Sequence, residues 1–189
     1  MASVQASVRA FAGESPCRLC SRVNSVLCSN IGAGRFVTLF YGVLDAERRI
    51  FRYTNAGHPL PILMRSGGRV QKLENGGAVL GVFPTWTYED SCLEFEPGDR
   101  LLLFTDGITE SGLPDNEEFG AEGIVASADQ CSAKSTHEVT SHILADAKQF
   151  CSSTIGDDAT LIVISALPRL KNTAATTGNE NAALCCIAR

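Results

Sequence analysis

Apolar positions recur with helical spacing in the first and third parts of the chain. Val4, Val8 and Phe11 predict a helix over residues 1–11, and Ser15 followed by Pro16 is typical of the start of a second helix, which is expected to end within 30–34. The same spacing predicts helices over 117–131 and from 135 onward. In the last of these, Ser135-Thr136-His137-Glu138 matches a capping box.

The middle of the chain changes to the shorter period of β-strands. Two hairpins are predicted, one from "RFVTLFYGVLD" and "RRIFRYT" around residues 45–47, the other from "PILMRSGGRVQKL" with its turn at 66–68. A fifth strand is predicted by the alternation of Trp86, Tyr88 and Cys92. A turn at 96–99 then leads into "RLLLFT", and "ATLIVISAL" forms a last strand after 156–158.

Helices, then strands, then helices and a final strand predict an α+β fold with a mainly antiparallel sheet covered by helices. A chain of 189 residues with 44% hydrophobic residues is long enough for one domain with a sizeable core. We assign this domain to residues 1–167. Residues 168–189 lack periodicity, which predicts a disordered tail.

Composition excludes several function classes. A net charge of −5 gives no basic field for a nucleic-acid partner, and no apolar run reaches the roughly 18 residues of a membrane span.

The 8 cysteines, without an export signal, are expected to be reduced thiols in the cytoplasm. Cys17 and Cys20 form a CxxC that could belong to a zinc or redox site, but no second pair follows, so helix packing is the preferred interpretation.

Carboxylates occupy the ends of two predicted apolar strands. Asp106 follows "LLLFT", whereas Asp157 and Asp158 precede "ATLIVI". If those strands are antiparallel neighbours, the acids meet at one edge of the sheet, where their repulsion requires shared protons or a cation. Oxygen ligands favour Mg²⁺ or Mn²⁺, and Gly107 would allow its backbone to approach such an ion. The alternative is that Asp106-Gly107 is only a turn and that Asp157-Asp158 only starts a strand.

The chain resembles the metal-dependent, 2C-like (PPM) protein phosphatases, in particular the bacterial branch of stage II sporulation protein E. The resemblance extends from Met1 to about Ile164. It rests on these stretches, in this order: "GRFVTLFYGVLD", "YTNAGHPLPIL", "GGAVLGVF", "EPGDRLLLFTDGITES", "EEFGAEGI" and "DDATLIVI". Each stretch alone is a weak signal, but their combination is specific.

This resemblance implies a layered α-β-β-α sandwich of two mainly antiparallel sheets and hydrolysis of phosphoserine or phosphothreonine on a protein. It implies two divalent cations, Mn²⁺ or Mg²⁺, with a bridging water that is activated for attack on phosphorus. Asp106 and Asp157 match metal ligands, with the backbone of Gly107 as a further candidate. The implied substrate is a phosphorylated anti-sigma-factor antagonist in bacterial signalling.

Other residues of the matching motifs are expected to support the centre. Asp158 lies where relatives often have Asn, and Thr160 follows it in the same motif. For His58, next to Asn55 in "NAGH", a structural donor and a phosphate-binding or supporting role are both open. Glu110 either supports the loop after Asp106 or faces solvent.

The chain departs from the family pattern at its start. Relatives carry a further metal-binding Asp on a strand before the helix that resembles "MASVQASVRAF", and the sequence starts inside that helix. We therefore expect a fold without its first strand or strands, weak metal binding and poor hydrolysis by this polypeptide. We also expect a sheet edge open to pairing in a homodimer. The alternative function is a catalytically incomplete module that acts by binding a protein.

Overall fold

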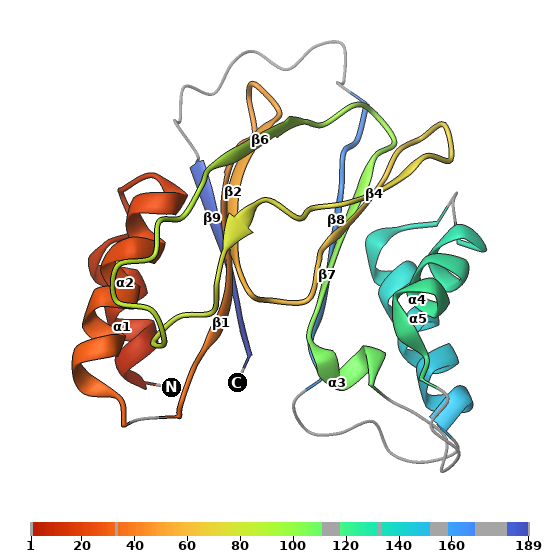
Figure 1. Ribbon diagram of the computed structural model, residues 1–189. Helices are drawn as coiled ribbons and strands as arrows, with labels where there is room; N and C mark the ends of the chain where they lie inside the picture. The colour runs from red at the N-terminus through yellow and green to blue at the C-terminus, as the bar shows by residue number, and fades with distance from the viewer. Residues whose placement is uncertain are drawn as a thin grey trace. The chain divides into compact units, whose positions relative to one another are not determined.

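The computed structural model describes residues 2–32, 34–110, 118–131, 134–151, 159–168 and 181–188. The chain divides into two compact units. The first comprises residues 1–58, 74–96 and 168–189, and the second comprises residues 59–73 and 97–167. Figure 1 shows the elements of both units along the chain.

The first unit contains two helices and one sheet. The helices are α1 (Ala2–Ala10) and α2 (Pro16–Asn30). The strands are β1 (Thr38–Asp45), β2 (Ile50–Ala56), β5 (Gly76–Gly77), β6 (Ser91–Glu94) and β9 (Asn181–Ala188). Their order is β5-β2-β1-β9, with β6 also paired to β2, and only the β2–β5 pairing is parallel.

The predicted first hairpin is confirmed as β1 and β2, paired antiparallel from Leu39 opposite Ala56 to Asp45 opposite Ile50. The Asp45 carboxylate accepts a hydrogen bond from the backbone N–H of Arg48 at 2.9 Å, which stabilises the turn. One face of the sheet is covered by α1 and α2. Its buried cluster contains Val4, Val8, Leu19, Cys20, Val23, Leu27, Val37, Leu39, Tyr41, Ala56, Leu80 and Tyr88.

The second unit also consists of one sheet packed against helices. Its sheet has the order β4-β3-β7-β8. The strands are β3 (Ile62–Met64), β4 (Val70–Lys72), β7 (Arg100–Phe104) and β8 (Leu161–Ser165), and the helices are α3 (Asp106–Thr109), α4 (Gly120–Asp129) and α5 (Thr136–Cys151). The predicted second hairpin is confirmed as β3 and β4. Gly68 has a φ of 82° in its turn, a conformation that glycine adopts without strain.

The core of the second unit lies between its sheet and α4 and α5. It includes Leu102 of β7, Ile124 of α4 and Ile143 of α5, all with no exposed surface. The predicted capping box is also confirmed: the backbone N–H and the hydroxyl of Ser135 both donate to Glu138 Oε2, at 2.9 and 2.8 Å. These bonds hold the pKa of the Glu138 carboxyl below its usual value.

The expectation of a fifth strand from residue 86 onward was wrong in the described structure. Trp86 and Tyr88 lie outside any strand, and the expected fifth strand is reduced to β6, which includes Cys92. Before β6 the chain makes single hydrogen bonds to its neighbours, such as Glu89 N–H to the Gly76 carbonyl at 3.2 Å, in place of a continuous ladder.

The C-terminal residues also differ from expectation. Residues 181–188, expected within a disordered tail, form β9, which pairs with β1 along eight residues. Hydrogen bonding to a neighbouring strand orders this segment although its sequence has no strand-like alternation. β9 covers the side of β1 that faces away from β2 and is the end strand of this sheet. No helix in the described part of the chain is long and apolar enough to cross a membrane.

Candidate metal centre

The strand that carries Asp106 is fixed by its neighbours on both sides. β7 pairs antiparallel with β3, Leu102 opposite Ile62, and antiparallel with β8, Phe104 opposite Leu161. The antiparallel arrangement of "LLLFT" and "ATLIVI" assumed from the sequence is thus confirmed. As a consequence, the chain leaves β7 and enters β8 at the same end of the sheet.

Two threonines continue the pairing beyond the ends of both strands. The backbone N–H of Thr105 donates to the Thr160 carbonyl at 3.1 Å, and the backbone N–H of Thr160 donates to Thr105 Oγ1 at 2.8 Å. Thr105 is buried, with 4% of its surface exposed. These two hydrogen bonds, called the Thr105–Thr160 joint below, fix the residue before Asp106 against the segment that enters β8. Asp157 and Asp158, which precede that segment, lie outside the described residues.

Asp106 is the first residue of the short helix α3. Its backbone carbonyl accepts hydrogen bonds from the Glu110 N–H at 2.8 Å and from Thr109 Oγ1 at 3.3 Å. Ile108 has no exposed surface and anchors the helix in the core of the second unit. Asp106 and Gly107 therefore begin a single helical turn, and a metal role for Asp106 stays a prediction.

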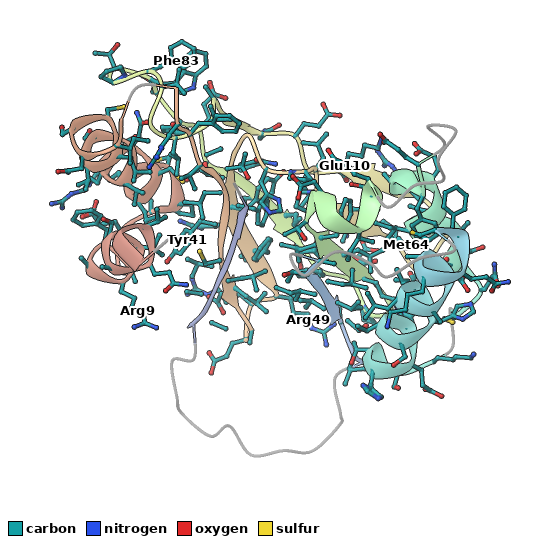
Figure 2. The ribbon with its side chains drawn as sticks, turned by 90° about the horizontal axis from the view of Figure 1, so that it is seen from below. Arg9, Tyr41, Arg49, Met64, Phe83 and Glu110 are labelled. Atoms are coloured by element: carbon teal, nitrogen blue, oxygen red, sulfur yellow. The ribbon has the colours of Figure 1, made fainter. Side chains whose placement is uncertain are left out.

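The Asp106 carboxylate is held by its own helix but is not enclosed. The Gly107 N–H donates to Oδ1 at 2.9 Å, and the side chain is partly exposed. Four positions on, Glu110 ends α3 and is exposed to solvent (Figure 2). A partly exposed carboxylate at the end of a strand has the oxygen chemistry that Mg²⁺ and Mn²⁺ require. No cluster of three or more His, Cys, Asp or Glu side chains suited to a metal occurs among the described residues.

We expect the Thr105–Thr160 joint to contribute to stability. Replacing Thr105 with Val removes the acceptor of the Thr160 N–H and should lower the free energy of unfolding by about 1 kcal/mol. Thr105→Ser retains the hydroxyl and should lower it less. Urea unfolding of both variants provides the comparison, and equal losses would show that the hydroxyl contributes nothing.

The motif around His58 forms a rigid turn at the end of β2 in the first unit. The Asn55 side chain spans the turn: its Nδ2 donates to the His58 carbonyl at 2.9 Å, and its Oδ1 accepts from the His58 N–H at 2.7 Å. Gly57 between them has a φ of 73°. Asn55 and His58 are 3% and 2% exposed, so both residues are buried.

A second glycine is required by the same turn. Gly76 of β5 lies directly against the backbone of Asn55, and a Cβ at this position would overlap the Asn55 carbonyl oxygen. The "NAGH" motif and the glycine of "GGAVLGVF" are therefore parts of one structure, although 20 or so residues separate them in the sequence. Sequence reasoning missed this role of Asn55; the signal was an Asn with Gly57 two positions later, since both residue types are common in turns.

Comparison with known proteins agrees with this architecture. The family model of stage II sporulation protein E (SpoIIE) matches residues 1–167. The chain is 29% identical over 160 residues to the phosphoserine phosphatase RsbU of Bacillus subtilis, which covers 80% of this chain and 45% of RsbU. It is 34% identical over 90 residues to protein IcfG of Synechocystis, with 48% of this chain and 14% of IcfG covered. The chain thus spans less than half the length of these curated relatives.

Solved structures show the same fold. The SiaA-PP2C domain of Pseudomonas aeruginosa has a TM-score of 0.71 at 17% identity, covering 87% of this chain and 66% of that domain. A structure of the SpoIIE PP2C phosphatase domain with a fragment of its regulatory domain, from Bacillus subtilis, also has a TM-score of 0.71, at 18% identity, with 86% and 49% covered. The expected fold class, α+β with two mainly antiparallel sheets, is confirmed. With the family model matching residues 1–167, the chain belongs to the stage II sporulation protein E family and carries its PPM-type phosphatase domain.

Proposed function

We propose that this chain hydrolyses phosphoserine or phosphothreonine on a regulatory protein. The observation that carries the proposal is the end of the β7–β8 pair, where Asp106 leaves one strand close to the entry of the segment that follows Asp157. Family membership supports the reaction type, because similar chains include proteins named phosphoserine phosphatases, RsbU and RsbP.

Asp106 and Asp157 are proposed to hold divalent cations, Mn²⁺ or Mg²⁺, with a weaker contribution from the Gly107 backbone. When bound, such cations activate water and neutralise charge on phosphoryl oxygens. The protein's contribution is to fix the carboxylates: α3 and the Thr105–Thr160 joint hold Asp106 at the strand end. Each ion takes about six oxygen ligands, so water or further protein oxygens would complete the set around these carboxylates.

Supporting roles are proposed for the other motif residues. Asp158 and Thr160 would position Asp157, which precedes them in the sequence, and Thr160 would do so through its backbone hydrogen bonds to Thr105. Asn55 is proposed to act structurally, by closing the turn at His58. For His58 the burial of its side chain favours a structural role over direct phosphate binding. Glu110, exposed at the end of α3, is proposed to influence the centre only through that helix.

The substrate proposed is a phosphorylated protein of the anti-sigma-factor antagonist class, in the cytoplasm. The net charge of −5 and the absence of a basic field argue against nucleic acid as a partner. A homodimer through an open sheet edge is also proposed; in the first unit that edge belongs to β9 and not to β1, because β9 pairs with all of β1.

Hydrolysis of a phosphoserine peptide by the purified chain tests the proposal. We expect phosphate release that depends on added Mn²⁺ and stops with a chelator, together with Mn²⁺ binding detectable by calorimetry. Neither binding nor hydrolysis at high Mn²⁺ would contradict the proposal and favour the alternative, a phosphatase-like module that acts by protein binding.

A further inference from the structure

The CxxC of α2 has no part in the proposed phosphatase centre. Cys17 is partly exposed, whereas Cys20, one turn later, has no exposed surface and belongs to the buried cluster between α2 and the sheet. Both are thiols in the structure. Cys20 therefore points toward the sheet, and any thiol that reaches it must come from the sheet side or from α2 itself.

The C-terminal strand brings a third thiol to this layer. In the β1–β9 pairing, Cys185 lies opposite Tyr41. Residues directly opposite each other in an antiparallel pair project from the same face of the sheet. Tyr41 is 2% exposed and belongs to the same cluster as Cys20, on the side of α1 and α2 (Figure 2). Cys185 is thus on the helix side of the sheet.

Electrostatic effects agree with this placement. Burial raises the pKa of the Cys20 thiol well above its usual value, and the next largest cause is the Cys185 thiol, ahead of Asp90 and Cys17. Cys185 also raises the pKa of Tyr41, after the larger effect of burial. Cys185 therefore lies near Cys20 and Tyr41. Its side chain is exposed to solvent, whereas that of Cys20 is buried.

We propose that oxidation joins Cys185 Sγ to Cys20 Sγ in a disulfide that fixes β9 to α2 at the edge of the first unit's sheet. With a peroxide as oxidant, the exposed Cys185 thiolate attacks the O–O bond and becomes a sulfenic acid, with release of one water. The Cys20 thiol then gives up its proton as its sulfur attacks the Cys185 sulfur, and the second oxygen leaves as water; the raised pKa of Cys20 makes this the slow step. The two thiols lose two hydrogens, and one peroxide becomes two waters.

This bond would turn a strand held by backbone hydrogen bonds into a covalently retained one. β9 covers the edge of β1, and an uncovered edge can pair with another chain. Linking residues 20 and 185 also closes nearly the whole chain into a ring, which stabilises the folded state relative to the unfolded one. The oxidised chain should therefore unfold at a higher temperature and keep β9 in place.

Tryptic cleavage of the native full chain separates the candidate thiols. Cys17 lies in the peptide 10–18, Cys20 in 19–22, and Cys185 with Cys186 in 172–189. After hydrogen peroxide treatment and alkylation of remaining thiols, mass spectrometry should find 19–22 linked to 172–189, and a reductant should release both. Recovery of 172–189 with both cysteines alkylated, or linked to 10–18, would overturn the proposal.

Single substitutions assign the partner within each peptide. Cys186→Ser and Cys17→Ser are the matched controls and should retain the link, whereas Cys185→Ser should abolish it. Loss of the link in Cys186→Ser, or its persistence in Cys185→Ser, would contradict the assignment. Because Cys185 is exposed, its substitution leaves the core intact, and the rise in melting temperature on oxidation should disappear in Cys185→Ser alone.

Discussion

Replacing Asp106 with Asn is expected to lower Mn²⁺-dependent hydrolysis of a phosphoserine peptide by at least about 100-fold, because a cation that loses a charged ligand loses several kcal/mol of transition-state stabilisation. The fold should be retained, since the amide oxygen of Asn can accept the Gly107 N–H as Asp106 Oδ1 does, and the backbone bonds of α3 are unchanged. Initial rates at saturating Mn²⁺ and melting temperatures measure the two effects.

The matched control is Asp129→Asn, which makes the same change at an exposed aspartate of α4 in the same unit. Its hydrolysis rate should equal that of the native chain. A rate for Asp106→Asn indistinguishable from that of Asp129→Asn would remove Asp106 from the proposed centre. Calorimetry with Mn²⁺ should show the same contrast in affinity, independently of turnover.

The largest expected loss of stability follows from truncation of Leu102. This side chain lies in the middle of β7, opposite Ile62 and Val163, and has no exposed surface. Leu102→Ala leaves a cavity between the sheet and its helices and should lower the free energy of unfolding by about 2–5 kcal/mol. Urea denaturation followed by circular dichroism measures the change.

Val70 provides the control for this substitution. It lies on β4 of the same sheet with 42% of its surface exposed, so Val70→Ala should change the free energy of unfolding by no more than about 0.5 kcal/mol. Equal losses for the two variants would show that the interior of the second unit is not where the structure places it.

Helices and strands marked by turn residues or by a capping motif in the sequence were predicted correctly. The hairpins at 45–50 and 65–69 have turn residues between apolar strands, and the Ser135–Glu138 capping box marks the start of α5. In each case the residues that decide the structure are close together in the sequence or repeat with a clear period.

Features that depend on distant partners could not be predicted in this way. The alternation of Trp86 and Tyr88 suggested a strand, but the neighbouring β5 is only two residues long and offers no ladder to extend. Residues 181–188 have no strand-like alternation, and their order comes from pairing with β1. The close approach of Gly76 to Asn55 likewise exists only after β2 and β5 have come together.

The central claim is that Asp106 and Asp157 bind a common divalent cation at the end of the β7–β8 pair. Anomalous X-ray diffraction from crystals of this chain grown with Mn²⁺ measures this directly. The account predicts a manganese peak within about 2.0–2.6 Å of a carboxylate oxygen from each residue. A crystal structure in which the two carboxylates lie too far apart to share an ion, with no manganese between them, would contradict it.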